Sequence, residues 1–145
     1  MKDIEIAKKH LKEENLTIIL VKDKEIIFKS KKRGISPIYE LAKEKKDLAR
    51  AGALGDKVIG KGAALLCKYI GVKEVYGELM SETAMEVLKK ANIKFSYSNS
   101  TKYIENRDKT GLCPIEKRAI DVENGETMLE KIEEFLEQLP IEKGG

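Results

Sequence analysis

Hydrophobic residues follow two different periods along the chain, and these periods divide its first part into a helix and two strands. From residue 3 onward, apolar side chains recur every three or four positions, which predicts a helix beginning at Asp3 and ending near Asn15. Two runs rich in β-branched residues follow at 16–21 and 25–29, and the short link between them predicts an antiparallel hairpin. Because Ile18–Val21 contains no polar residue, we expect that strand to be buried on both faces.

The middle of the chain is predicted to be helical, with a glycine-rich loop before its most apolar helix. Ser36 and Pro37 are typical of a helix start. The apolar face that follows comprises Ile38, Leu41, Ala42, Leu48 and Ala49. The stretch 55–62 is rich in glycine and predicts a loop that leads into a helix over Ala63–Ile70. Only Lys68 in that helix is charged, so we expect the helix to be central and covered on several sides.

The second half alternates strands and helices. Residues 74–80 and 94–97 predict two strands, joined by a helix that Ser81 can cap, and this order implies a parallel pair. Residues 103–110 are polar and predicted to be irregular. Pro114 indicates another helix start, and a final amphipathic helix over 126–139 is stopped by Pro140. The predicted fold is therefore α/β, a three-layer α/β/α arrangement with a mixed sheet, in a single domain over residues 1–145.

Composition narrows the function only slightly. Charged residues make up 37% of the chain but leave a net charge of only +3, so the balance gives no strong argument for nucleic acid as a partner. No apolar run approaches membrane-spanning length and no signal peptide begins the sequence, so we expect a cytoplasmic protein that does not enter a membrane. Cys67 and Cys113 stand too far apart to suggest a disulfide framework. No cofactor is predicted.

The start of the central helix is the first candidate site. Gly60, Lys61 and Gly62 would leave free N–H groups open to an anion, and an ammonium at this end of a helix is unfavourable unless an anion joins it. The alternative is an exposed lysine between glycines that allow close helix packing. Asp56 could pair with a neighbouring lysine or cap a turn. Gly55, Gly60 and Lys61 match a phosphate loop, but Gly62 replaces the required Ser or Thr.

Two further helix starts carry residues with chemical potential. Ser81 is most simply a helix cap, and Glu82 suits the first turn electrostatically, although its place at a strand end also makes it a catalytic candidate. Cys113 at a helix start would have its thiolate stabilised, with cationic residues nearby in sequence, so it is a candidate catalytic thiol. A packed and inert cysteine is the alternative, since His10 is the only histidine available as a base. Cys67 is predicted to lie in the core.

Three local motifs in this order resemble an uncharacterised prokaryotic family that is placed in the cytidine-deaminase-like fold. The motifs are 56–64 (DKVIGKGAA), 81–84 (SETA) and 113–116 (CPIE). True deaminases of that fold bring His-x-Glu to the start of the central helix and Pro-Cys-x-x-Cys to the start of the next, where zinc activates water. This chain has neither motif, because Gly60–Ala64 and Leu79–Ala84 stand in those places without His or Cys. The resemblance therefore implies the fold without catalytic zinc, and we predict no metal site.

These observations leave the question of an enzyme open and support three hypotheses. The first is a site for a small nucleotide-like or phosphate-bearing ligand at the start of the central helix, where the resemblance implies that Lys61, Ser81 and Glu82 converge. The second is a non-catalytic regulatory or protein-interaction module that kept the fold and lost the metal. The third, contact with RNA, is least favoured because no surface pattern of aromatic and basic residues is present. A homodimer is kept as a further partner to test.

Overall fold

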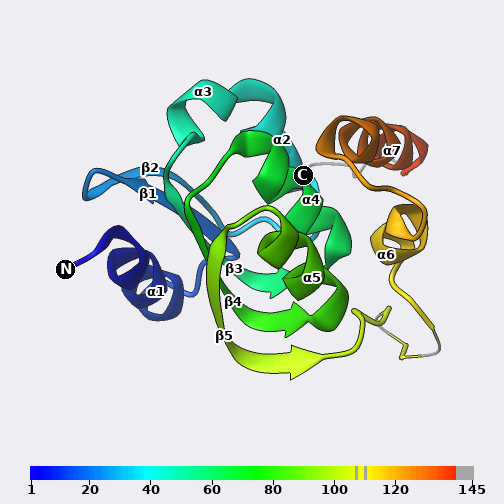
Figure 1. The fold of residues 1–145 in the computed structure, drawn as a ribbon, viewed down its shortest axis with the longest axis horizontal. Helices are drawn as coiled ribbons and strands as arrows, with labels where there is room; N and C mark the ends of the chain where they lie inside the picture. Colours follow the sequence, from blue (N-terminus) through cyan, green and yellow to red (C-terminus); the bar gives the residue numbers. More distant parts are fainter. Residues whose placement is uncertain (107, 110, 140–145) are drawn as a thin grey trace.

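The computed structural model describes residues 1–139 except 107 and 110, and it shows a mixed five-stranded sheet with helices, an α/β fold (Figure 1). The strands are β1 (Ile18–Lys22), β2 (Glu25–Ser30), β3 (Ala53–Ile59), β4 (Glu74–Ser81) and β5 (Lys94–Thr101). The helices are α1 (Asp3–Glu13), α2 (Ser36–Glu44), α3 (Lys46–Ala49), α4 (Lys61–Ile70), α5 (Glu82–Lys90), α6 (Pro114–Ala119) and α7 (Gly125–Gln138). The order across the sheet is β2-β1-β3-β4-β5.

The predicted hairpin is confirmed, and its turn is held by a buried carboxylate. β1 pairs antiparallel with both β2 and β3. The two turn residues, Asp23 and Lys24, have φ angles of 51° and 67°, as a tight two-residue hairpin turn requires. Asp3 accepts hydrogen bonds from the Asp23 and Lys24 N–H groups at 3.1 and 2.9 Å. The four residues 18–21 are fully buried, as the absence of polar side chains there predicted.

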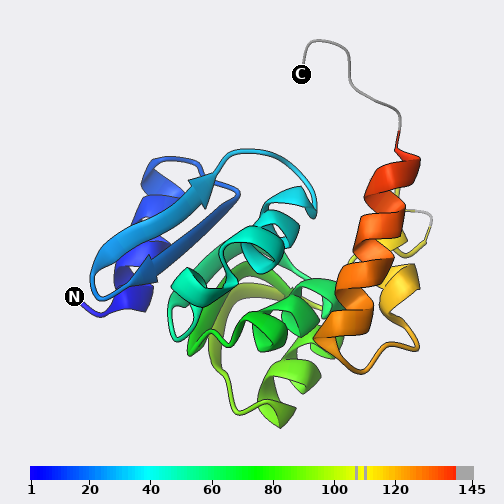
Figure 2. The ribbon, with the colours of Figure 1, turned by 90° about the horizontal axis from the view of Figure 1, so that it is seen from above.

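Helices cover both faces of the sheet. α1 packs its apolar residues, among them Ala7 and Leu11, against β1, β3 and β4, where they meet the buried ring of Tyr76. The other face carries the larger hydrophobic core, with α4 at its centre in contact with α2, α5, α6 and α7. α6 and α7 stand at the end of the molecule opposite α1 and the hairpin (Figure 2). The prediction that the 63–70 helix is central is therefore confirmed.

The prediction of a glycine-rich loop before this helix is wrong, because residues 53–59 form β3. β3 lies in the middle of the sheet, antiparallel to β1 and parallel to β4. Glycine and aspartate have weak intrinsic preference for strands, but pairing on both edges and burial override that preference. Since Gly55 lies inside a strand, the Gly55–Lys61 stretch is not a phosphate loop. Leu48, predicted to be on an inward face, is 58% exposed because α2 ends at Glu44 and the short α3 follows.

The second half agrees closely with the predicted order. β4 and β5 pair in parallel, although β5 extends to Thr101 beyond the predicted end. Ser81 caps α5 by accepting a hydrogen bond from the Ala84 N–H at 3.1 Å. Pro114 occupies the first turn of α6, after Cys113, while Pro140 lies outside the described residues. Within the described ranges, no helix has the length and apolar character needed to cross a membrane.

Candidate functional site

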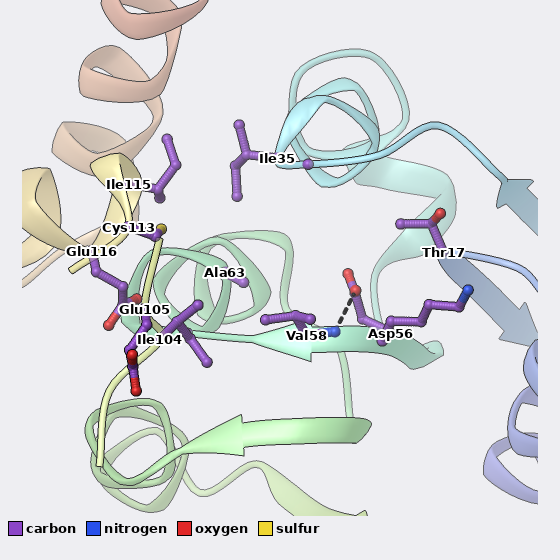
Figure 3. Close-up of a pocket in the computed structure, with 13 residues that line it drawn as sticks. Thr17, Ile35, Asp56, Val58, Ala63, Ile104, Glu105, Cys113, Ile115 and Glu116 are labelled. Atoms are coloured by element: carbon purple, nitrogen blue, oxygen red, sulfur yellow. Dashed lines mark hydrogen bonds between the residues drawn. The ribbon is translucent and has the colours of Figure 1, made fainter. Parts of the chain in front are cut away.

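A cavity of about 330 Å³ lies where β3 ends and α4 begins (Figure 3). Its apolar walls come from Ile35, Val58, Ala63, Ile104 and Ile115. Its polar and charged lining consists of Thr17, Asp56, Lys57, Glu105, Cys113 and Glu116, and two glycines, Gly34 and Gly60, complete it. Asp56 and Thr17 lie on one side of the cavity and Cys113, Ile115 and Glu116 on the other (Figure 3). Five stretches of the chain (17, 34–35, 56–63, 104–105 and 113–116) therefore build one cavity that opens to solvent.

Asp56 is the most unusual group in this cavity. It lies in the interior of β3, paired with Ile18 of β1 and Gly77 of β4, and only 8% of the residue is exposed. Burial raises the pKa of Asp56 to about 8, and the negative charge of Glu78 acts in the same direction. A hydrogen bond from the Val58 N–H to Asp56 Oδ1, at 3.1 Å, opposes this shift without cancelling it. Asp56 is therefore mostly a neutral carboxylic acid at pH 7.

The opposite wall is brought to the cavity by the segment between β5 and α6. An isolated bridge joins Glu105 to Leu112, and the Cys113 N–H donates to the Ile104 carbonyl at 3.0 Å. This pairing folds the segment back on itself, so that α6 begins beside the start of α4. The folded-back segment explains how Cys113 and Glu116, more than fifty residues after Lys61, reach the same site.

The Glu116 side chain lies at the start of α4, where the sequence predicted an anion-binding site. Its Oε1 accepts a hydrogen bond from the Lys61 N–H at 2.7 Å, and only 6% of the residue is exposed. Burial raises the pKa of Glu116, while hydrogen bonds from the N–H groups of Lys61, Gly62 and Ile104 oppose that rise. The free N–H groups at the start of α4 are thus bound by a carboxylate of the chain itself.

Gly60 and Gly62, at the start of α4, leave space that the α6 segment fills, so they do not leave the helix start open to a ligand from solvent. A Cβ atom at Gly60 would overlap the Glu116 carboxylate, and one at Gly62 would lie 2.8 Å from Ile115 Cγ2. Both positions therefore require glycine for the close approach of the α6 segment. This geometry agrees with the alternative prediction that the glycines around Lys61 allow close helix packing.

Lys61 points away from the cavity. Its Nζ donates to the Ile120 carbonyl at 3.0 Å, at the C-terminal end of α6, and lies 3.9 Å from Glu123 Oε1. The partial negative charge at the end of α6 compensates an ammonium that would otherwise oppose the α4 dipole. A role for Lys61 in ligand binding stays a prediction, and the described contacts give it a structural partner instead.

The remaining candidates are divided between the cavity and other places. Ser81 is fully buried and its hydroxyl is engaged as the α5 cap, whereas Glu82 is exposed in the first turn of α5. Neither lines the cavity. Cys113 does line it and is half-buried, with a free thiol, while Cys67 is fully buried in α4. Of the predicted site residues, the structure therefore brings Asp56, Gly60 and Cys113 together.

The two stretches that the sequence resemblance compared with the zinc-binding motifs of deaminases do not suit that metal. Gly60–Ala64 and Ser81–Ala84 supply no imidazole or thiolate, and the Glu116 carboxylate is bound to backbone N–H groups. In the part of the chain that the structure describes, no three His, Cys, Asp or Glu side chains are grouped so that they could hold a metal ion.

The fold and the cavity define the class of protein: a small α/β domain with a largely apolar cavity at the end of a central strand. The chain belongs to the DUF1893 family (TM1506), a domain of unknown function whose model matches residues 6–136. A crystal structure of a DUF1893 family protein (TM1506) from Thermotoga maritima is similar, with a TM-score of 0.83 and 22% sequence identity over 93% of this chain and 91% of that one. No curated protein matches the sequence.

Sequence reasoning missed the residues that come from outside the three motifs or act through tertiary contacts. Thr17 and Ile35 flank the hairpin and the start of α2, and nothing local marks them as lining a site. In the sequence, Glu116 stands out only as the last residue of the CPIE motif. Its role as a hydrogen-bond acceptor for the Lys61 N–H depends on how the segment before α6 folds back. The one available signal was its place two residues after Pro114, in the first turn of a short helix.

Proposed function

We propose that this protein is a small-molecule-binding domain that holds a nucleobase-like ring in the Asp56 cavity. The observation that carries the proposal is a buried carboxyl group that stays protonated near neutral pH inside a largely apolar cavity. Perturbed titratable groups in enclosed cavities are candidates for binding or catalytic sites. A volume of about 330 Å³ suits a compact ligand rather than a large cofactor.

The chemistry of a protonated carboxyl group selects the kind of ligand. Because Asp56 Oδ1 accepts from the Val58 N–H, protonation is favoured on Oδ2. A neutral acid then offers one O–H donor and one acceptor side by side, which matches the paired donor and acceptor atoms on the edge of a nucleobase. Side chains such as Ile35, Ala63 and Ile115 would contact the faces of the ring. A ligand with an anionic group on the side of the cavity opposite Asp56 is disfavoured, because the Glu116 carboxylate lines that side.

The finer fold assignment belongs to this proposal. The element order, with one helix and a hairpin followed by alternating helices and strands, supports the cytidine-deaminase-like three-layer arrangement. So does the position of α1 on one face and α4 on the other. In this proposal the domain uses that fold for binding without zinc, in the cytoplasm. The binding site lies beside the start of the central helix, on the β1 side of β3.

The proposal is tested by measuring the binding of the four common nucleobases and their ribonucleosides by calorimetry between pH 6 and 9. We expect binding of at least one ring below pH 8 and a loss of affinity as Asp56 ionises above that pH. Asp56→Asn keeps a donor and an acceptor, so it should bind at every pH tested. Asp56→Leu removes both, and we expect its affinity to fall by about tenfold or more.

Glu86→Gln is the matched control, because Glu86 is an exposed acid of α5 that does not line the cavity. This variant should bind like the unmodified protein. Equal affinity in Asp56→Leu, or no binding of any ring compound by the unmodified protein, would refute the proposal. The second outcome would favour the regulatory or protein-interaction module instead.

A further inference from the structure

A basic groove lies beside the Asp56 cavity. The groove has a volume of about 470 Å³, and it shares Thr17, Gly34, Lys57 and Val58 with the lining of the cavity. Shared lining residues mean that the two spaces are neighbours. A ligand whose ring fills the cavity can therefore extend a second group into the groove.

Three cations line this groove and come from two parts of the sequence. Lys31 and Arg33 lie in the segment between β2 and α2, and Lys57 lies in β3. In the part of the chain that the structure describes, none of the three forms an ion pair with a carboxylate. The Lys57 Nζ instead donates to Asn15 Oδ1 at 2.7 Å.

The nearby Lys29 differs from the three groove cations because it forms an ion pair. Lys29 Nζ is paired with Glu14 Oε1 at 2.8 Å. Among the described residues, no carboxylate pairs with Lys31, Arg33 or Lys57, so their positive charge creates a local potential that attracts an anion. The planar guanidinium of an arginine together with lysine ammonium groups is a typical combination for binding phosphate.

We propose that this groove is the phosphate subsite of the same ligand, so that the ligand is a nucleotide whose ring enters the cavity and whose phosphate lies among Lys31, Arg33 and Lys57. This inference rests on the proposed function. It moves the phosphate away from the start of α4, where Glu116 already binds the N–H groups. It also favours a mononucleotide over an RNA strand, because the groove lining contains no aromatic side chain on which successive bases could stack.

The test compares each ribonucleoside with its 5′-monophosphate by calorimetry at low ionic strength, where phosphate contacts are least screened. The unmodified protein should bind the monophosphate at least about tenfold more tightly than the nucleoside. Lys31→Gln/Arg33→Gln, which keeps only Lys57 in the subsite, should lose most of this preference, with the affinity for the nucleoside unchanged. The matched control is Lys89→Gln/Lys90→Gln, which removes the same charge from two exposed residues of α5 and should keep the full preference.

The outcomes distinguish a failure of this inference from a failure of the proposed function. If nucleosides bind but phosphate adds no affinity, or its gain survives in Lys31→Gln/Arg33→Gln, the phosphate subsite is refuted while the ring site stands. If neither nucleosides nor nucleotides bind, both proposals fail. Tighter binding of a single-stranded oligonucleotide that is unaffected by Asp56→Leu would also refute the inference and indicate a nucleic-acid surface.

Discussion

Replacing Asp56 by Asn should stabilise the protein, and the gain should grow with pH. The amide has nearly the shape of the carboxyl group and keeps an oxygen that can accept the hydrogen bond from the Val58 N–H. What it removes is the tendency of the group to ionise. In the unfolded chain Asp56 loses its proton near its ordinary pKa of 3.8, whereas burial holds the proton in the folded chain up to about pH 8.

The sign follows from proton binding in the two states. Between these two pKa values the folded protein binds one proton more than the unfolded chain, so Asp56 lowers the free energy of unfolding as pH rises. The gap between 3.8 and about 8 corresponds to about 6 kcal/mol once both limits are passed, and to about 3 kcal/mol near pH 6. These are upper values, because water can enter the cavity when the carboxylate forms. Even half of this effect is large beside a total stability of about 5–15 kcal/mol.

The assay is equilibrium urea unfolding of the unmodified protein and of Asp56→Asn from pH 4 to pH 9. The difference between the two unfolding free energies isolates Asp56 from Glu116 and the other titrating groups, provided that they behave alike in both proteins. We expect the difference to be close to zero at pH 4 and to rise steadily toward pH 8. As a control, Glu78→Gln removes a charge that raises the pKa of Asp56, so it should make the pH dependence shallower.

A difference that stays constant with pH would refute the reasoning, because it would mean that Asp56 has the same pKa in the folded and unfolded states. A variant that is less stable at every pH would show that the carboxylate itself stabilises the fold. Confirmation would mean that this position costs stability at neutral pH, which is typical of residues kept for a function.

Three further predictions concern Glu116, Ser81 and Cys113. Glu116→Ala should lower the free energy of unfolding by about 1–2 kcal/mol, because the N–H groups at the start of α4 lose their hydrogen-bond acceptor. Glu116→Gln keeps an acceptor oxygen and should lower the free energy of unfolding by less. Urea unfolding measures both variants. Ser81→Ala should cost about 1 kcal/mol by removing the buried cap of α5, which the same assay would show, whereas an unchanged midpoint would contradict it. Iodoacetamide should label Cys113 in the native protein and Cys67 only in denaturant, as followed by mass spectrometry. A ring compound bound in the cavity should slow labelling of Cys113, and equal rates with and without it would argue against a shared site.

Much of the fold could be predicted from local patterns, since those patterns carry their own physical cause. The run 18–21 has no polar residue, so it must be buried on both sides, and Ser81 and Pro114 mark helix starts through a cap and a fixed φ angle. The alternation of strand and helix after residue 72 implies the parallel pairing of β4 and β5. The central position of α4 followed from its nearly complete lack of polar residues.

β3 could not be predicted in this way, because its stability comes from its neighbours. Its sequence ALGDKVI contains residues with weak preference for strands, and pairing with β1 and β4 together with burial holds it extended. The same burial gives Asp56 its raised pKa, so the chemistry of the site also depends on the tertiary structure.

The sequence by itself determined which helix is central and where its first N–H groups, which have no partner within the helix, lie. Apolar content and glycine spacing are local properties. Only the tertiary structure decided what binds those N–H groups. The segment 104–116 folds back and places Glu116 on the start of α4, and the cavity opens beside it between Asp56 and Cys113. Contacts between residues more than fifty positions apart depend on how the whole chain packs, and no local pattern encodes them.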